Sequence, residues 1–387
     1  MTKKRSVAMA IELEWPYKRH HDVFAGAYRY AQEQGGWKFV LDEYPELTLE
    51  TARAKAPYDG IIGRVTPRLA AATQAAGIPL VNVWNSSPVT DVPVVAPDFE
   101  AAGRMAAEHL LARGFEHFGF IGRTRERGPR QQLRGFDAVL TEAGFLQSSL
   151  MIPGSYPNTS ANWRKFTAKV DGWMDQWAYP MGVNASYDLL ARHVACVCDR
   201  KGLDVPQDVA LVGTHNEPVI CDHPEPSLTS IDLGYERVGY RAAQLLDEMM
   251  NGDAAPEEPI HLPPAELVSR RSTDSLAVED DMVAAALRFI SEHSHEPIKV
   301  GDVAKGLHVA RRTLERRFSK RLGRSIAAEI ARLRVERAKR KLVATKAPIK
   351  SIARKLGFAD SLQMTVVFKR LAGVTPSAYR RERQEKL

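Results

Sequence analysis

The stretch Ile349-Lys-Ser-Ile-Ala-Arg-Lys-Leu356-Gly-Phe358, followed by Ser361-Leu-Gln-Met-Thr-Val-Val-Phe-Lys-Arg-Leu371, predicts a short helix, a turn and a second helix. Apolar residues recur at helical spacing in both parts, and Met364, Val367 and Phe368 share the inward face of the second. This is a helix-turn-helix pattern, and its second helix has the size that enters the major groove of DNA.

The same pattern occurs about fifty residues earlier. Val300-Gly-Asp-Val-Ala-Lys-Gly-Leu307 predicts a short helix, His308-Val309 a turn, and Arg311 to Leu322 a second helix with Leu314 and Phe318 on one face. Between the two units, Ile326 to Val343 predicts a longer helix with one apolar face. Such a helix can hold the two units at a fixed spacing.

Charge separates this part of the chain from the rest. Residues 276–387 carry 26 lysines and arginines against 12 aspartates and glutamates, whereas residues 1–275 carry 28 against 35. A compact basic domain attracts polyanions and releases their counterions on binding, which a domain of net negative charge does not do. The C-terminal part is therefore expected to bind nucleic acid, and the alternative for its charge is a solvated basic surface.

The composition, with 44% hydrophobic and 26% charged residues, is typical of a globular protein that can bury hydrophobic cores. The apolar run after Met1-Thr-Lys-Lys-Arg is interrupted at Glu12, too early for a secretory signal or a membrane span, so we expect a cytoplasmic protein and no membrane partner. Three cysteines fit a reducing compartment. Cys196 and Cys198 are expected to be buried helix cysteines rather than half of a zinc site.

Residues 1–275 alternate short apolar runs with helical patterns, as in a parallel α/β fold. Successive units of this kind imply right-handed crossovers, with ligands at the carboxyl ends of the strands. The number of units favours two lobes with a cleft between them. The predicted strands are Val7–Leu13, Trp37–Leu41, Gly60–Gly63, Leu80–Trp84, Phe118–Gly122, Met181–Val183 and Val209–Gly213.

The C-terminal part resembles the AraC-type DNA-binding domain over about Asp281 to Arg383. The resemblance rests on Ile349-x-x-Ile-Ala-x-x-Leu-Gly-Phe358, Val367-Phe-Lys-Arg370, Gly373-Val-Thr-Pro-Ser377 and Tyr379-Arg380. It implies an all-α domain at residues 276–387 in which two helix-turn-helix units read a double-stranded DNA operator.

The first part resembles the sensor core of lactose- and galactose-repressor-type proteins, which has a two-lobed periplasmic-binding-protein-like fold. The resemblance is carried by Val95-Ala-Pro-Asp-Phe-Glu-Ala-Ala-Gly103, His109-Leu-Leu-Ala-Arg-Gly114, Val205-Pro-Gln-Asp-Val-Ala-Leu-Val-Gly213 and Leu267-Val-Ser-Arg-Arg-Ser-Thr273. It implies a sensor domain at residues 1–275, with lobe one at about 1–116 and 233–258, and lobe two at about 117–232 and 259–275. Those repressors carry their DNA-binding unit before the core, so here DNA binding is expected from the C-terminal part.

A sensor of this type followed by an AraC-type reader is the arrangement of the bacterial xylose operon regulators, and the whole chain resembles them. This resemblance implies a regulator, expected to be an activator, that responds to D-xylose or a related monosaccharide. It also implies a homodimer that acts with RNA polymerase, without a cofactor, a metal or catalytic residues. Activation against repression stays open at this point, as does the identity of the monosaccharide.

The resemblance directs the search for the sugar to the strand ends around the cleft, where amides and carboxylates can bind vicinal hydroxyls and aromatic rings can cover ring carbons. Relatives often carry arginine where this chain has Gln132 and an acidic residue where it has His215. For Trp84 the alternative is ordinary core packing, and for His215 it is a loop histidine bonded to backbone. The candidate ligand-binding residues are Glu12, Trp15, Tyr17, Trp84, Asn85, Asp98, Gln132, Asn184, His215 and Asn216.

In the AraC-type pattern the exposed side of each second helix reads bases. The first unit would read bases with Arg312, Glu315 and Arg316, because arginine can donate twice to guanine and glutamate can accept from cytosine. Phosphate contact is the alternative for these arginines and for the neighbouring Arg311, which is also a candidate DNA-binding residue. The second unit departs from the family, which usually has aromatic residues and an arginine here, and would rely on thymine methyl contacts or discriminate less. Its candidate base-reading residues are Ser361, Leu362, Gln363 and Val366, and the candidate phosphate contacts are Arg354, Lys355, Lys369 and Arg370.

Two other classes of protein are the alternatives. The sequence shows none of the nucleophile-elbow, phosphate-loop, dinucleotide-binding or zinc-protease motifs that would favour an enzyme acting on a sugar. An exported sugar-binding protein would need a signal peptide and would not explain the basic C-terminal domain.

Overall fold

The computed structural model describes residues 4–14, 17–52, 56–153, 159–223, 225–274, 280–293, 297–322, 324–345 and 347–384. Its internal contacts fall into two units, one of residues 1–112 with 116–273 and one of residues 113–115 with 274–387. The expected junction between residues 275 and 276 lies outside the described residues. Within the described ranges, no helix is both long enough and apolar enough to cross a membrane.

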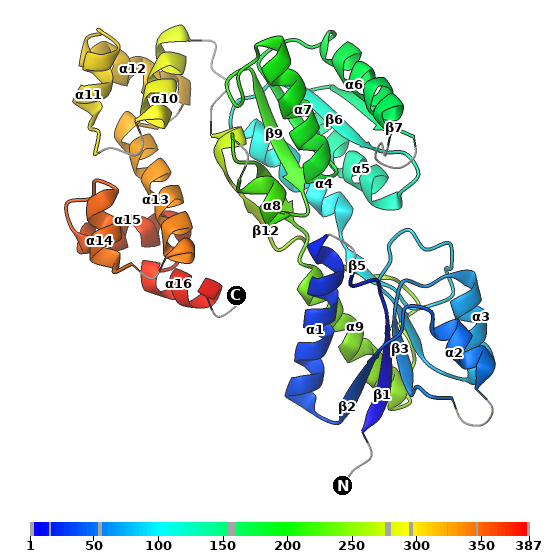
Figure 1. Ribbon diagram of the computed structural model, residues 1–387. Coiled ribbons are helices and arrows are strands. Elements are labelled where there is room, and N and C mark those ends of the chain that lie inside the picture. The colour runs from blue at the N-terminus through cyan, green and yellow to red at the C-terminus, as the bar shows by residue number, and fades with distance from the viewer. Residues whose placement is uncertain are drawn as a thin grey trace. The chain divides into compact units, whose positions relative to one another are not determined.

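Lobe one of the first unit is built on a parallel sheet in the order β2-β1-β3-β4 (Figure 1). Its inner strands are apolar because both faces are covered, with Val7, Ile61 and Val81 fully buried. The long helices α1 and α9 pack together, and α2 packs with α3. The elements are β1 (Arg5–Ala10), α1 (Lys18–Gln34), β2 (Trp37–Leu41), α2 (Pro45–Thr51), β3 (Gly60–Gly63), α3 (Pro67–Ala76), β4 (Leu80–Asn82) and α9 (Tyr235–Met250).

Lobe two is built on a six-stranded sheet in the order β12-β10-β9-β8-β6-β7, parallel except for the β10–β12 pair. Its helices pack as the pairs α4 with α5 and α6 with α7. The elements are α4 (Phe99–Leu111), β6 (His117–Arg123), α5 (Arg127–Glu142), β7 (Gln147–Ile152), α6 (Ser160–Met174), β8 (Met181–Ala185), α7 (Asp188–Lys201), β9 (Val209–Thr214), α8 (Pro218–Cys221), β10 (Thr229–Asp232), β12 (Glu266–Val268) and the 3₁₀ turn η1 (Arg271–Thr273).

The crossings between lobes differ from the predicted boundaries. Helix α4 packs against α5 in lobe two, and strand β11 (Ile260–Leu262) pairs in parallel with β5 (Val95–Pro97), beside the lobe-one sheet. Lobe one therefore ends at about residue 98 rather than 116 and includes residues up to about 262 rather than 258. The prediction was wrong because α4 begins directly after β5, with Asp98 alone between them, so no loop marks the crossing.

Each lobe contains one helix pair that is packed through glycines. A Cβ on Gly103 of α4 would overlap the carbonyl oxygen of Gln132 on α5, and a Cβ on Gly135 would overlap that of Glu100 on α4. The α1–α9 pair repeats this arrangement with Gly26 and Gly239. The absence of a side chain at these positions lets the helix backbones touch.

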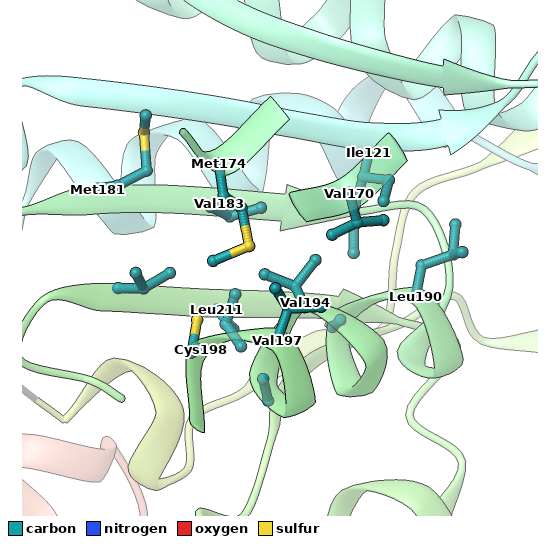
Figure 2. Packing of buried hydrophobic residues seen from close by; sticks show 14 of the residues in the cluster. Ile121, Val170, Met174, Met181, Val183, Leu190, Val194, Val197, Cys198 and Leu211 are labelled. Carbon is teal, nitrogen blue, oxygen red and sulfur yellow. The ribbon is translucent and has the colours of Figure 1, made fainter. Parts of the chain in front are cut away.

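The core of lobe two lies between the sheet and helices α6 and α7 (Figure 2). Val183 and Leu211 on the strands face Val194 and Val197 on α7, and all four are fully buried. Cys198 belongs to this core, as predicted, but Cys196 is exposed, which corrects the expectation that both are buried. Two residues apart on a helix, the two side chains point about 200° away from each other, so one faces solvent.

In the described part of the C-terminal unit, the regular elements are all helices. They are α10 (Asp281–Glu292), α11 (Val300–Gly306), α12 (Arg311–Leu322), α13 (Ile326–Ala344), α14 (Ile349–Lys355), α15 (Ser361–Ala372) and α16 (Pro376–Gln384). The first half of α13 packs with α10, α11 and α12, and its second half packs with α14 and α15. Helix α13 thus belongs to both cores, which confirms its predicted role as the connection between the two helix-turn-helix units.

The residues predicted to face inward in these units do so. Leu314 and Phe318 on α12 are fully buried, as are Met364 and Phe368 on α15. On α13 the apolar face is buried as well, from Ile326 to Leu342. The spacing of apolar and charged residues along the sequence therefore predicted both the helices and the face that each one buries.

Candidate ligand cleft and nucleic-acid interface

The sensor unit contains a cavity of about 310 Å³ whose walls come from both lobes. The side chains enter it where strands end and helices begin, as expected for a parallel α/β sheet. Arg19 lies in the first turn of α1, Arg123 ends β6, Tyr187 precedes α7 and Tyr235 begins α9. The described lining residues are Ile11, Arg19, His20, Val23, Arg64, Val83, Trp84, Asn85, Ser86, Pro97, Phe99, Arg123, Arg125, Glu126, Gly128, Pro129, Tyr187 and Tyr235.

A smaller cavity of about 40 Å³ shares Arg19, Arg123 and Tyr187 with the first. It is also lined by Tyr17, Asp188, Leu189, Thr214, His215, Glu217 and Ile220. The three shared residues mark where the two cavities meet.

His215 is held in a stack of aromatic rings. Its ring lies 4.8 Å from that of Tyr187 and 5.9 Å from that of Tyr235, with interplanar angles of 22° and 7°. Burial, and then the positive charges of Arg19, Lys18 and Arg123, hold the pKa of His215 well below its usual range. The imidazole is therefore neutral at pH 7.

The arginines of the cleft contact carboxylates and rings. A guanidinium nitrogen of Arg64 lies 3.3 Å from the Glu12 carboxylate, and the guanidinium stands 4.8 Å from the Trp84 ring centroid. Arg123 donates to Glu126 at 3.1 Å and its guanidinium stands 4.7 Å from the Tyr187 ring centroid. Partly buried cation–π contacts of this kind fix the orientation of a guanidinium group.

Four of the predicted ligand residues line a cavity. Trp84 and Asn85 line the larger one, and Tyr17 and His215 line the smaller one. Asn85 also donates to Gln131 at 2.7 Å, and this hydrogen bond joins lobe one to α5 of lobe two. Trp84, only half-buried, is a wall of the cleft rather than a core residue.

The other predicted residues bind protein groups. Gln132 is fully buried and donates to Asn184 at 3.2 Å and to Thr214 at 2.8 Å, so it joins α5 to the ends of β8 and β9. Asp98 accepts from the backbone of Ala101 as the N-cap of α4.

Asn216 contacts Asp232 and Arg270, and Glu12 faces Arg64. Five of the predicted residues are not among the described lining residues of either cavity: Glu12, Asp98, Gln132, Asn184 and Asn216. Trp15 lies outside the described residues.

The residues that dominate the cleft were missed by sequence reasoning. Arg19, Arg64, Arg123 and Tyr187 each follow a predicted strand by a few residues or end it, which is the position that signals a ligand residue. Amides and acids are the side chains expected to bind the hydroxyl groups of a sugar, so the arginines were not among the predicted residues.

The second helix of each helix-turn-helix unit, α12 or α15, carries predicted base-reading residues that are exposed to solvent. On α12, Arg311, Arg312 and Arg316 are exposed, and Glu315 pairs with Arg311 at 3.1 Å. On α15, Leu362 is 72% and Val366 60% exposed, an uncommon position for large apolar side chains.

Gln363 is partly engaged with its own helix. Its side chain accepts from the backbone of Ala359 at 2.7 Å, and its backbone donates to Asp360 at 2.7 Å. This is a reciprocal cap on the N-terminus of α15. Of the remaining predicted residues, Ser361 is half-buried, while the cationic ones are exposed: Arg354, Lys355, Lys369 and Arg370.

Comparison with known proteins agrees with this division. Residues 107–273 match the periplasmic binding protein-like domain family, and residues 303–382 match a helix-turn-helix domain family. The xylose operon regulatory protein of Haemophilus influenzae is 30% identical over 355 residues, which cover 88% of this chain and 89% of the relative. The Escherichia coli K12 protein of the same name is 26% identical, over 98% of this chain and 97% of the relative.

A solved structure described as the xylose-binding transcription activator xylR is 25% identical, with a TM-score of 0.66, covering 98% of this chain and 99% of that one. The likeness thus includes both units and their order along the chain. By its identity to the H. influenzae relative over most of both sequences, the chain belongs to the family of xylose operon regulatory proteins.

Proposed function

We propose that the protein regulates transcription of a pentose-utilisation operon, binding operator DNA through its C-terminal unit and a monosaccharide in the cleft of its sensor. The observation that carries the proposal is the presence, in one chain, of a cavity lined from two lobes and of two helix-turn-helix units with exposed cationic second helices. The names of the relatives support xylose, or a related monosaccharide, as the effector.

A ligand that contacts both lobes stabilises the conformation in which they are closed, and can shift the conformation of the sensor only through this difference in affinity. We propose that closure changes how the two protomers of a homodimer are arranged, and thereby the spacing between their DNA-reading helices on the operator. We further propose that the dimer activates transcription with RNA polymerase, and that it works in the cytoplasm where the DNA is. A solved relative described as a transcription activator supports activation.

Operator binding tests the proposal directly. Affinity for candidate operator DNA, taken from the promoters of pentose-utilisation genes, is measured with and without D-xylose and a panel of other monosaccharides. A thermal-shift screen of the same panel identifies ligands, because a ligand that binds only the folded state raises the melting temperature. Equal operator affinity with every sugar would contradict the proposal, and turnover of a sugar by the purified protein would favour an enzyme.

A further inference from the structure

An ion pair connects the two lobes of the sensor next to one of their crossings. Lys18 begins α1 in lobe one, and its ammonium nitrogen lies 3.1 Å from Oδ2 of Asp232, which ends β10 in lobe two. The backbone N–H of Lys18 also donates to the carboxylate of Glu217 in lobe two, at 3.1 Å. Because α1 moves with lobe one, opening or closing of the cleft changes the distance from Lys18 to both carboxylates.

Both members of this ion pair are mostly buried and charged at neutral pH. Burial alone would lower the pKa of Lys18, but the charges of Asp232 and Asp22 hold it above its ordinary value. Burial alone would likewise raise the pKa of Asp232, but the charge of Lys18 and the hydrogen bonds to the carboxylate hold it below its ordinary value. Charges that are poorly screened by solvent interact strongly. A displacement of Lys18 therefore acts strongly on the Asp232 carboxylate.

The oxygen of Asp232 that contacts Lys18 also binds Asn216. The side-chain amide of Asn216 donates to this Oδ2 atom at 3.1 Å. The other carboxylate oxygen accepts from the backbone N–H of Gly234 at 2.9 Å. Since one oxygen serves both donors, a change at Lys18 alters the hydrogen bond of Asn216.

Asn216 is also connected to the cleft through the backbone. It follows His215, whose ring lines the smaller cavity, and φ is 96° for His215 and 53° for Asn216. Residues other than glycine rarely adopt a positive φ, and a backbone held there by its surroundings can relax when they move. A ligand that displaces the His215 ring therefore also acts on Asn216.

Arg270 binds the other end of the Asn216 side chain. Its guanidinium donates to the amide oxygen of Asn216 at 2.8 Å and to the carbonyl oxygen of Leu228 at 3.0 Å, and its Nε lies 2.7 Å from the carboxylate of Asp222. Arg270 is only 8% exposed. These three partners fix the orientation of a planar, buried group, so a change at Asn216 changes how firmly Arg270 is held.

Arg270 begins the exit segment of the sensor, which we define as residues 270–273, because the C-terminal unit begins directly after Thr273. Ser272 donates to the carbonyl of Leu211 on β9 at 2.6 Å, and the hydroxyls of Thr273 and Thr229 on β10 lie 2.8 Å apart. These contacts fix one end of the exit segment to the sheet of lobe two. Its other end is held by Arg270, whose contacts depend on Asn216.

We infer that closure of the cleft fixes the exit segment through four side chains in series: Lys18, Asp232, Asn216 and Arg270. A fixed exit segment restricts the orientations available to the C-terminal unit and so changes its affinity for an operator. The inference rests on the proposed function, in which a sugar closes the cleft, and names the residues that carry the effect to the start of the DNA-binding unit.

Hydrogen exchange of the full-length protein tests the connection, because amide exchange reports local opening. Lys18→Gln should make the amides of the exit segment exchange about three-fold faster or more, although the contacts of Lys18 are with Asp22, Glu217 and Asp232. The comparison is made without sugar and with D-xylose. Equal exchange in Lys18→Gln and the unmodified protein under both conditions would overturn the inference.

Arg29→Gln is the matched control for Lys18→Gln. Arg29 is another cation of α1, but its ion pairs with Glu33 and Glu236 stay within lobe one. Exchange of the exit segment should be unchanged in this variant. If Arg29→Gln accelerated exchange as much as Lys18→Gln, the effect would come from general loosening of α1 and the inference would be wrong.

Operator binding tests the series as a whole. The response is the ratio of operator dissociation constants without and with D-xylose, at a sugar concentration that calorimetry shows to be saturating for each variant. Lys18→Gln and Arg270→Lys should each lower this ratio by about three-fold or more, within the roughly 5- to 150-fold range of typical couplings. Lysine at position 270 keeps a charge for Asp222 but lacks the planar group that reaches Leu228 and Asn216 together.

The double variant separates one connection from two independent effects. If Lys18 and Arg270 act in series, the double variant should respond no less than the weaker of the two single variants. Effects at independent sites would instead multiply. Arg271→Gln, which removes the neighbouring exposed arginine and its ion pair with Glu225, should keep the full response. Multiplying effects, or an equal loss in Arg271→Gln, would contradict the inference.

The two measurements distinguish failure of this inference from failure of the proposed function. If operator affinity responds to D-xylose equally in all variants, the proposed function stands and the inference fails. If no sugar changes operator affinity in the unmodified protein, the proposed function fails, and hydrogen exchange without sugar alone decides whether Lys18 fixes the exit segment.

Discussion

The hydroxyl of Ser230 on β10 donates a hydrogen bond of 2.5 Å to the carboxylate of Asp188 at the start of α7, and both side chains are buried. The backbone N–H of Glu217 donates to the other oxygen of Asp188 at 2.9 Å. Burial raises the pKa of Asp188 to about 7, because it outweighs the hydrogen bonds that favour the charged form. The carboxyl therefore titrates near neutral pH inside lobe two.

Asp188 should make the sensor less stable as the pH rises. Its pKa is higher in the folded than in the unfolded protein. The contribution of this group to the free energy of unfolding is therefore most favourable below about pH 4 and is lost as the pH rises through about 7. The change attributable to this group is on the order of 4 kcal/mol over that window. Urea unfolding between pH 4.5 and 8 should show a flatter pH dependence in Asp188→Asn, whereas the exposed Asp175→Asn should retain the slope. The same slope in Asp188→Asn as in the unmodified protein would contradict the prediction.

Gly135→Ala should destabilise lobe two. The added Cβ overlaps the Glu100 carbonyl on α4, and the two helices must separate, at a cost of about 1–3 kcal/mol. Gly172 lies within α6, and a Cβ there meets no atom within 4 Å, so Gly172→Ala should instead stabilise by about 1 kcal/mol. Denaturant unfolding measures both changes. A shift of the same sign in the two variants would show that helix contact does not decide the outcome.

Glu329→Gln should destabilise the C-terminal unit. Glu329 is buried, with Arg324 at 2.7 Å and Arg332 at 2.7 Å. Burial alone would raise its pKa, but these guanidinium groups hold the pKa below its usual range, so this stabilisation is lost as the pH falls through the lowered pKa. Removing one partner of such a buried pair costs about 3–5 kcal/mol.

Glu315→Gln is the matched control for Glu329→Gln. Its ion pair with Arg311 is exposed and contributes less than about 1 kcal/mol. Calorimetric unfolding of both variants is the measurement. A loss in Glu329→Gln no larger than in Glu315→Gln would mean that the buried cluster contributes nothing to stability.

Arg316 and Lys355 should differ in how they affect DNA binding. Arg316→Ala should relax the preference at one base pair, at a cost of about 1–3 kcal/mol, because arginine reads a guanine edge. Lys355→Ala should weaken binding to all sequences and reduce the salt dependence by about one phosphate contact. Binding is measured on a panel of operator variants at two salt concentrations. Indistinguishable profiles for these exposed residues would contradict the two roles.

The exposed apolar side chains of α15 should detect thymine methyl groups. Replacing thymine by uracil in the DNA segment that the second unit contacts removes only methyl groups and should weaken binding by several-fold. Leu362→Ala should weaken binding to thymine DNA and reduce the effect of the exchange, with Val366 accounting for the effect that remains. Because Leu362 is 72% exposed, its removal should leave the unfolding free energy nearly unchanged. A variant in which the exchange keeps its full effect would exclude this contact by Leu362.

The C-terminal helices could be predicted almost to the residue because local signals agreed. Asp360 caps α15, Gly373 ends it with a φ of 76°, and the apolar positions recur at the helical period between them. In the sensor, the predicted runs became strands β1–β4, β6, β8 and β9. Strand β7 and helices α2 and α6 were not predicted, although the buried Phe166, Val170 and Trp173 of α6 do recur at helical spacing.

The cleft was harder to predict because its chemistry depends on which strand ends are adjacent. Trp84 and Asn85 could be found from one strand end alone. The guanidinium groups of Arg19 and Arg123 become one site only when two lobes meet, which no local pattern encodes. Gln132 follows the pattern of a ligand residue, yet it is fully buried, and its amide nitrogen donates to residues at the neighbouring strand ends.

The pairing of β5 with β11 limits how the sensor can move. Two of its three interlobe connections leave from these parallel, hydrogen-bonded strands, and the third passes through Gly234, whose φ is 71°. A two-stranded ribbon bends across its flat face but resists sliding, because sliding breaks the hydrogen bonds between the strands. Opening and closing should therefore follow a single bending coordinate. A ligand that binds both lobes can then shift the sensor along this one coordinate only, towards its closed end.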